Sequence, residues 1–185
     1  GAQEFYGVTP DICTMGKALG GGHALAAVMG RSDIMSVFGG GYNRGAADDD
    51  VWVNQTGNLN GAPIACAAGL ATLAEMRKEG AYEGVRATGR RLRQALSDIC
   101  AKNGIPVQIG GEESVFDIFF TDRPVVTYRD GLAADSQMMT RFVERLLERR
   151  ILRGQLKFYP SVVHTEQDVD RTIEAFEEVI PTLRG

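Results

Sequence analysis

A single lysine flanked by glycines places the tightest constraint on how this chain can fold. Lys17 follows Gly16 and is itself followed, after two more residues, by Gly20-Gly21-Gly22. Because glycine has no Cβ, the backbone on both sides of the lysine is free to turn sharply. The apolar run Ile12–Met15 predicts a short buried strand just before it, and Pro10 disfavours a helix at that point. We therefore expect Lys17 at the end of a strand, on a tight turn with little side-chain bulk around it.

The Gly16-Lys17 pair is open to more than one interpretation. A phosphate-binding P-loop needs another glycine five residues before Gly16 and a serine or threonine directly after Lys17. The chain has Asp11 and Ala18 at these two positions. The three glycines at 20–22 do not make the G-x-G-x-x-G dinucleotide fingerprint either. A phosphate-binding module would therefore rest on the glycines alone. The remaining interpretations are a surface lysine on a flexible loop and a desolvated Schiff-base lysine that meets a planar cofactor.

A second group of polar donors precedes a long alanine-rich stretch. Pro63 predicts the start of a helix that runs to about Arg77. Thr56-Gly57-Asn58 lies just upstream, so hydroxyl, amide and backbone N–H donors meet a helix N-terminus, which suits a phosphate group. Plain N-capping of the helix by Asn60 needs no ligand and stays open as the alternative.

The remaining elements alternate between strands and helices. A buried strand is expected at Leu25–Met29, and a further strand at Val51–Gln55. Downstream, a helix that carries Val85, Leu92, Leu96 and Ile99 is expected to close at Gly104, and strands are expected at 106–109 and 115–120, separated by Gly110-Gly111. A loop at 128–136, a helix at 135–150 and extended segments at 151–156 and 158–163 are expected next. Thr165 is expected to begin a final helix, with Asp168 as its capping-box partner. This order predicts part of a large α/β domain followed by a small α+β domain.

Composition limits the classes of partner. A net charge of −4 gives no electrostatic reason to expect nucleic acid or an anionic membrane. No apolar run approaches the roughly 20 residues of a membrane span. Cys13, Cys66 and Cys100 are far apart and form no C-x-x-C motif, which favours reduced thiols and a cytoplasmic setting.

Two polar features are expected to be structural rather than catalytic. Asp48-Asp49-Asp50 ends a glycine-rich stretch without the spacing of an EF-hand, so we expect a solvated loop and predict no metal site. His23, beside the triple glycine, is interpreted as a hydrogen-bonded loop residue.

Two longer stretches together resemble a known family. Gly7–Gly22, with its GVTPD…GK…GGG pattern, and Gly57–Leu70 are similar to class III pyridoxal-phosphate aminotransferases, and within that class to the glutamate-1-semialdehyde 2,1-aminomutase type. Lys157–Thr165 resembles the closing strand of the same family. The resemblance covers essentially all 185 residues, but it corresponds only to the C-terminal part of the family's chain.

The resemblance implies a fold and a domain boundary. It implies the fold-type-I architecture of pyridoxal-phosphate-dependent transferases, an α/β large domain followed by a small α+β C-terminal domain. Residues 1–79 would be the C-terminal portion of the cofactor-binding large domain, and residues 80–185 the small domain.

The resemblance also implies an activity. Lys17 would hold pyridoxal 5'-phosphate as a Schiff base and would then act as the general base in amino-group transfer, of either the aminotransferase or the aminomutase kind, on a small amino or keto substrate. In this family a threonine contacts the cofactor phosphate across a homodimer interface; the matching position here is Asn58, and Thr56 offers a hydroxyl two residues earlier. The alternative is a truncated or split chain that is inactive alone and serves as the folded partner of an N-terminal half.

Overall fold

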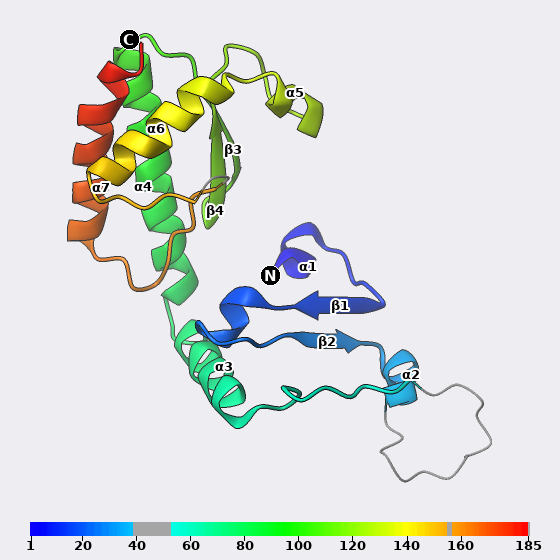
Figure 1. The fold of residues 1–185 in the computed structure, drawn as a ribbon. Helices are drawn as coiled ribbons and strands as arrows, with labels where there is room; N and C mark the ends of the chain where they lie inside the picture. The colour runs from blue at the N-terminus through cyan, green and yellow to red at the C-terminus, as the bar shows by residue number, and fades with distance from the viewer. Residues whose placement is uncertain (39–52, 155–156, 185) are drawn as a thin grey trace. The chain divides into compact units, whose positions relative to one another are not determined.

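A computed structural model describes residues 1–38, 53–154 and 157–184 of the chain (Figure 1). The chain divides into two compact units, Gly1–Lys78 and Glu79–Gly185. The Asp48–Asp50 loop and the first two residues of the strand expected at Val51–Gln55 lie outside the described residues, as does the end of the extended segment expected at 151–156. The described remainder of that strand, Val53–Gln55, has no regular secondary structure.

The N-terminal unit consists of short elements and one long helix. In chain order they are α1 (Ala2–Tyr6), β1 (Ile12–Met15), the 3₁₀ helix η1 (Lys17–Gly20), β2 (Ala27–Gly30), α2 (Ser32–Met35), the 3₁₀ helix η2 (Ser36–Phe38) and α3 (Pro63–Met76). β1 and β2 pair antiparallel, with Cys13 opposite Met29. The connection between these two strands carries Lys17.

The strands β1 and β2 form close to where the sequence predicts them, but the prediction that they are buried is wrong. Ile12 is 51% exposed and Val28 is 49% exposed. Within the described residues, β1 and β2 make a sheet of two strands only. Apolar strands become buried when further layers cover both faces of their sheet, and the described part of this unit does not supply both layers.

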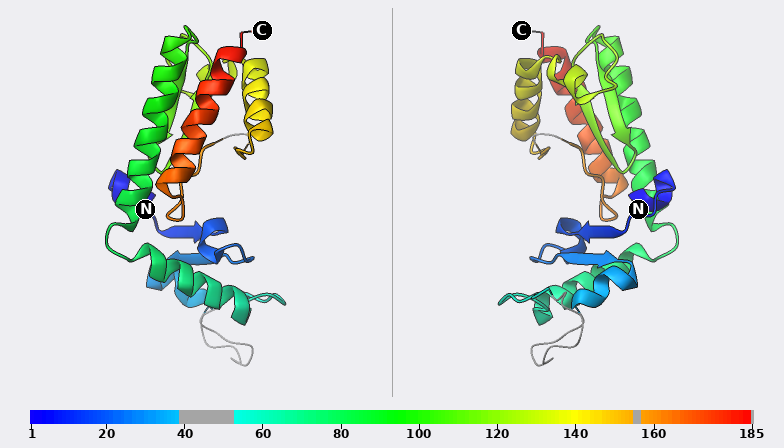
Figure 2. Two further views of the ribbon diagram at one scale, coloured as in Figure 1. Left: turned by 90° about the vertical axis from the view of Figure 1, so that its left-hand side faces the viewer. Right: turned by 90° about the vertical axis from the view of Figure 1, so that its right-hand side faces the viewer.

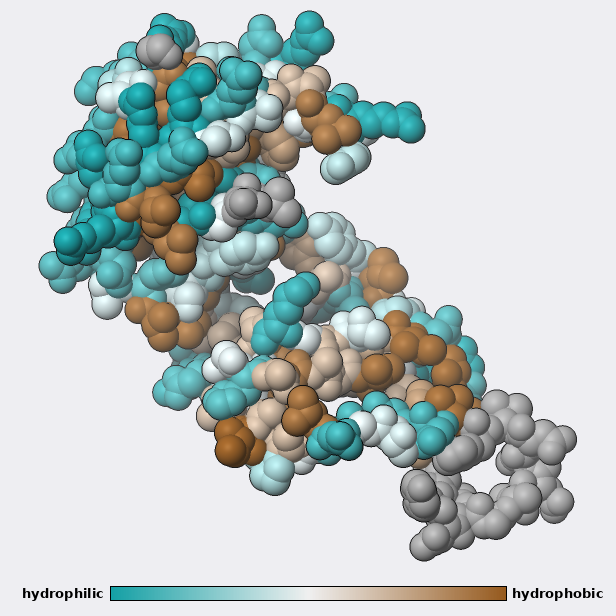
Figure 3. Space-filling view, in the orientation of Figure 1, coloured by the Kyte–Doolittle hydropathy of each residue, from teal (hydrophilic) through white to brown (hydrophobic). Residues whose placement is uncertain are grey.

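The helix α3 confirms the predicted helix within one residue at its end. Pro63 occupies its first position, where the missing N–H costs nothing. Ala65 and Gly69 are buried, yet Ile64 and Leu70 are about 70% exposed, and apolar side chains show on the surface of this unit (Figure 3). A helix that is apolar all round has the composition of a buried helix, although the described residues leave one face of α3 uncovered.

The C-terminal unit packs three long helices with a hairpin. Its elements are α4 (Ala81–Lys102), β3 (Gln108–Glu112), β4 (Val115–Phe119), α5 (Tyr128–Leu132), α6 (Ser136–Glu148), α7 (Glu166–Val179) and the 3₁₀ helix η3 (Ile180–Thr182). Figures 1 and 2 show α7 running alongside α4, and α6 packs against α7. β3 and β4 pair antiparallel, with Gly110 opposite Asp117.

The core of this unit is aromatic at its centre. Phe142 is fully buried, and its ring centroid lies 5.6 Å from that of Phe120 and 6.0 Å from that of Phe176. The predicted stripe of α4 faces this core, because Leu92, Leu96 and Ile99 are all buried. Cys100 is also fully buried, and burial raises the pKa of its thiol to about 11, so the thiol stays protonated near neutral pH.

The turn of the hairpin is not where the sequence was expected to place it. Gly110-Gly111 does not separate the two strands but lies inside β3, and Glu113-Ser114 makes the turn. Gly111 has a φ of 94°, and a Cβ there would lie 2.7 Å from the carbonyl oxygen of Val115. The glycine is therefore needed for a close approach within the hairpin rather than for its turn.

The segment 128–136, expected to be a loop, begins with the helix α5. The Thr127 hydroxyl accepts a hydrogen bond from the Asp130 N–H, and the Asp130 carboxylate accepts one from the Thr127 N–H at 2.7 Å. This reciprocal pair is a capping box, and T-x-x-D was its signal in the sequence.

The segment after α6 is extended but makes no regular strand in its described part. Phe158 forms a single antiparallel bridge with Phe116, and their rings stack at 4.8 Å. Arg153, only 5% exposed, pairs with Asp117 at 2.5 Å and lies over the Phe158 ring. Burial raises the pKa of Asp117, and the nearby guanidinium opposes that rise.

The helix α7 begins at the predicted capping box, which yields a prediction about stability. Thr165 Oγ1 accepts a hydrogen bond from the Asp168 N–H at 3.2 Å. We expect Thr165→Ala to lower the free energy of unfolding by about 1 kcal/mol, because an N–H at the helix start loses its acceptor. Urea unfolding tests this, with Thr140→Ala inside α6 as the control. A loss no larger than in that control would contradict the capping role.

Candidate functional site

Lys17 lies where β1 gives way to η1, on the tight turn that the sequence predicts. Gly16 is extended, with φ −169° and ψ −163°, and Lys17 then adopts φ 55° in the left-handed region. Among the described non-glycine residues, only Lys17 and Arg150 have a positive φ. This conformation costs an L-residue about 1–2 kcal/mol, and residues held in it concentrate at functional sites.

The turn that carries Lys17 is anchored on α3 by close contacts of glycine. A Cβ on Gly21 would overlap the Thr72 hydroxyl and lie 3.4 Å from the carbonyl oxygen of Ala68. On the helix side, Gly69 is buried, and a Cβ there would run into Leu25. The glycines therefore bring the loop directly against the helix backbone, which fixes the base of the lysine while its side chain remains exposed.

The amine of Lys17 has no bonding partner in the described part of the chain. Among the described residues it forms no hydrogen bond or ion pair. His23, in the same loop, donates its backbone N–H to Gly20 O at 2.9 Å, as expected of a loop residue. The side chain is therefore accessible on a fixed turn, but the described residues do not supply the desolvation expected for a Schiff-base lysine.

The second candidate group, Thr56-Gly57-Asn58, lies in the exposed segment before α3. The Asn60 N–H donates to Gly57 O at 3.0 Å, which folds this segment into a turn. The capping role proposed for Asn60 is wrong: Ala62 is the N-cap, no side chain caps α3, and the Asn60 amide donates to Gln55 instead.

Two backbone donors at the start of α3 are open as a result. Among the described residues, the N–H groups of Ile64 and Ala65 have no acceptor. Together with the Thr56 hydroxyl and the Asn58 amide they form a set of neutral donors that fits a phosphate group.

The structure does not bring the two candidate groups together within the unit. The lysine turn packs on α3 around Gly69 and Thr72, whereas Thr56-Gly57-Asn58 precedes Pro63. Gly69 and Thr72 lie six and nine positions after Pro63, which corresponds to about 9 and 14 Å along the helix at a rise of about 1.5 Å per residue. A single chain therefore offers an amine at one place and phosphate donors at another.

Two kinds of feature are absent from residues 1–38, 53–154 and 157–184. In that part of the chain, no group of three or more His, Cys, Asp or Glu side chains is placed to hold a metal ion. None of its helices is both long and apolar enough to cross a membrane.

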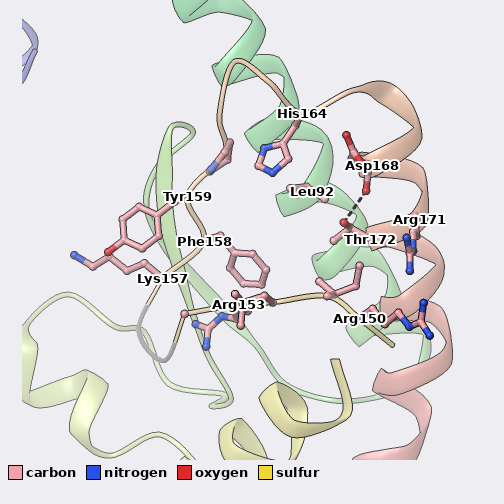
Figure 4. Close-up of a pocket in the computed structure, with 14 residues that line it drawn as sticks. Leu92, Arg150, Arg153, Lys157, Phe158, Tyr159, His164, Asp168, Arg171 and Thr172 are labelled. Atoms are coloured by element: carbon pink, nitrogen blue, oxygen red, sulfur yellow. Dashed lines mark hydrogen bonds between the residues drawn. The ribbon is translucent and has the colours of Figure 1, made fainter. Parts of the chain in front are cut away.

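Sequence analysis missed one group of polar residues altogether. Arg150, Arg171 and His164 line a cavity in the C-terminal unit (Figure 4). His164 directly precedes the expected helix start at Thr165, and the two arginines lie in stretches whose pattern indicates only a helix surface. The one signal, an arginine at the position after a helix where glycine is usual, becomes visible only when the helix end is known.

Comparison with known proteins places this geometry in context. The family model described as aminotransferase class-III matches residues 1–180. Glutamate-1-semialdehyde 2,1-aminomutase 2 of Brevibacillus brevis is 38% identical over 178 residues, which are 95% of this chain and 39% of that protein.

Solved structures give the same picture for the fold. An omega-transaminase from Sphaerobacter thermophilus aligns with a TM-score of 0.88 at 28% identity, over 100% of this chain and 41% of the other. A structure described as a transaminase with PLP bound aligns with a TM-score of 0.82 at 23% identity, over 99% and 41%. The fold is therefore that of the transaminases, and the chain spans about two fifths of the length of the relatives it matches.

Proposed function

Because the chain belongs to the class-III aminotransferase family, we propose that it forms the lysine-bearing part of a pyridoxal-phosphate-dependent enzyme that transfers an amino group. The observation that carries this proposal is the left-handed, uncommitted Lys17 on a glycine-flanked turn, fixed against α3. The proposed activity is of the aminotransferase or aminomutase kind, and the substrate is a small amino or keto compound.

Lys17 has two tasks in this proposal. Its Nζ would hold the cofactor covalently and would be released when the amino substrate binds. The released Nζ would then act as a general base. It would accept a proton from the amine-bearing carbon of the substrate and would deliver that proton to C4′, the former aldehyde carbon of the cofactor. When bound, pyridoxal phosphate supplies the electron sink that makes this carbon acidic.

Thr56, Gly57 and Asn58 are proposed to hold the cofactor phosphate, with the open N–H groups at the start of α3. Since these donors lie away from Lys17 along α3, they would serve the site of a second copy, and the enzyme would be a homodimer. The exposed apolar face of α3 supports the proposal that further protein covers this unit.

The phosphate role of Asn58 yields a separate prediction. We expect Asn58→Ala to raise the dissociation constant for pyridoxal phosphate about tenfold, because a hydrogen bond to a charged group is worth about 1.5–3 kcal/mol. Fluorescence titration of the apoenzyme measures it. Leu59→Ala, a neighbouring side chain that is 71% exposed, is the control. Equal affinities in the two variants would remove Asn58 from the site.

The domain roles and the setting are further parts of the proposal. The N-terminal unit would be the end of the large cofactor-binding domain, with the boundary near Gly80, and the C-terminal unit would be the small domain. The free thiols at Cys13, Cys66 and Cys100 favour a cytoplasmic setting. The alternative, a folded partner that is inactive without an N-terminal half, is favoured by the share of the relatives that the chain spans.

One assay separates the two kinds of activity. The complete protein is incubated with an amino donor and pyridoxal phosphate, with and without an added keto acid. An aminotransferase forms a new amino acid only when the keto acid is present, whereas an aminomutase moves the amino group to the neighbouring carbon of the same molecule without it. Absence of both products across amino and keto substrates would contradict the proposed function.

A further inference from the structure

A cavity of about 300 Å³ lies in the C-terminal unit, beside the start of α7 and the segment that follows α6 (Figure 4). Leu92 and Phe158 give part of its wall an apolar surface, and Arg150, His164 and Arg171 bring nitrogen donors to it. Its volume falls at the lower end of the range for small-molecule sites. An apolar wall with a few polar groups is also the usual composition of such sites.

The charge around this cavity is positive and unbalanced. Among the described residues, the guanidinium groups of Arg150 and Arg171 form no hydrogen bond or ion pair, whereas that of the neighbouring Arg149 is paired with Glu178 at 2.5 Å. Lys157 lines the cavity as well; it forms no ion pair in the described chain, although its charge acts on Asp117 and opposes the rise in the pKa of that carboxyl. Positive groups gathered at one cavity without counterions favour an anionic ligand there.

The acidic group of the described lining is already engaged. Asp168 Oδ2 accepts hydrogen bonds from the Thr165 N–H at 2.8 Å and from the Thr165 hydroxyl at 2.7 Å. Arg153 also lines the cavity, but its charge is matched by that of Asp117. Among the described lining residues, one capping carboxylate therefore accompanies three cations, Arg150, Arg171 and Lys157, that form no ion pair in the described chain.

Arg150 is held at this place at a cost in stability. The Ile151 N–H donates to Leu146 O and the Arg150 N–H donates to Leu147 O, both at 2.9 Å. These two bonds make a Schellman helix end, in which Arg150 takes the left-handed position, with φ 62°, that glycine usually occupies. Glycine would adopt this φ without strain, so stability does not account for the arginine. A strained residue that lines a cavity points to a ligand.

His164 adds a neutral donor of defined orientation. Its Nδ1 accepts the Ser161 N–H at 3.0 Å. Because a backbone N–H can only donate, Nδ1 is the unprotonated nitrogen and Nε2 carries the proton. Nε2–H is therefore available to an acceptor in the cavity, and Figure 4 shows the ring on the cavity side.

We propose that this cavity binds a small organic oxyanion, held by the guanidinium groups of Arg150 and Arg171 and by Nε2–H of His164. The planar guanidinium matches both carboxylate and phosphate oxygens, and Leu92 and Phe158 would lie against the carbon part of the ligand. The site belongs to the C-terminal unit and does not rest on the proposed function of Lys17.

Titration calorimetry on the complete, cofactor-loaded protein tests this site with two probes, inorganic phosphate and succinate, at an ionic strength held constant with chloride. We expect saturable binding of at least one probe, weakened about tenfold or more in Arg150→Gly and in Arg171→Gln. Arg129→Gln, an exposed cation on α5 outside the described lining, is the matched control and should bind as the parent does.

Thermal melting curves of the parent and the variants show whether a weaker affinity comes from a folding defect. Arg150→Gly should melt at or above the parent temperature, because glycine relieves the left-handed strain, so a weaker affinity in this variant reports the lost guanidinium. Preference for phosphate or for succinate identifies the ligand as a phosphate ester or a carboxylate. No saturable binding of either probe, or equal affinity in the parent and both cavity variants, would overturn the proposal.

Discussion

Replacing Lys17 with alanine is expected to abolish turnover in the complete protein while leaving the fold intact. The side chain is exposed and, within the described residues, bonded to nothing, so its removal should cost little stability. Its amine is the group proposed to hold the cofactor and to move the proton, and loss of a general base alone typically lowers a rate by about 10²–10⁴. With covalent attachment lost as well, we expect a decrease of at least about 10³-fold.

Steady-state assays of the parent and the variant measure this effect, and circular dichroism checks the fold. Lys78→Ala is the matched control, because Lys78 is an exposed lysine of the same unit whose ammonium pairs with Glu75 at 2.6 Å. We expect that variant to keep the parent rate. Transamination that persists in Lys17→Ala would remove Lys17 from its proposed role.

The largest expected effect on stability comes from a glycine inside α4. A Cβ on Gly89 would overlap the carbonyl oxygen of Glu113 and lie 2.6 Å from its carbonyl carbon. The obstacle is backbone at the hairpin turn, so neither the helix nor the hairpin can relieve it by a rotamer change. We expect Gly89→Ala to lower the free energy of unfolding by about 3 kcal/mol, at the upper end of ordinary overpacking.

A second glycine of the same helix provides the control. A Cβ on Gly84 would meet nothing within 4 Å, so Gly84→Ala should raise the free energy of unfolding by about 0.5–1 kcal/mol through helix propensity alone. Urea unfolding of both variants measures the contrast. Equal effects of the two substitutions would show that the β3–β4 turn does not rest on α4 at Gly89.

The helices of this chain could be predicted from sequence because their signals are local. Proline at the start of α3, the Thr165 capping box of α7 and the apolar stripe of α4 each lie within a few turns of helix. The short helix α5 carried an equally local signal in Thr127 and Asp130 that was overlooked.

Features that depend on contacts between distant residues could not be predicted in this way. Gly110-Gly111 looked like a turn, yet the close approach to β4 that requires glycine is known only once the strands are paired. Burial of β1 and β2 was predicted from their apolar residues, but burial depends on neighbouring layers, which a strand's own sequence does not specify.

The candidate site likewise has one part that local sequence signals predict and another part that depends on contacts between distant residues. The glycines predicted a tight turn at Lys17 with little side-chain bulk around it, and the structure confirms that turn at the end of β1. That the lysine itself, rather than a glycine, takes the left-handed conformation depends on how η1 packs against α3. The cavity of Arg150, His164 and Arg171 joins residues from two elements, so no single stretch of sequence indicates it.

The most direct test of the central claim is to locate the cofactor on the chain. The complete protein is incubated with pyridoxal phosphate, reduced with borohydride, digested and examined by mass spectrometry for the phosphopyridoxyl group. We predict that Lys17 carries the label and that Lys78, Lys102 and Lys157 remain unlabelled at one equivalent of cofactor. Labels scattered over those other lysines, with Lys17 unmodified, would contradict it.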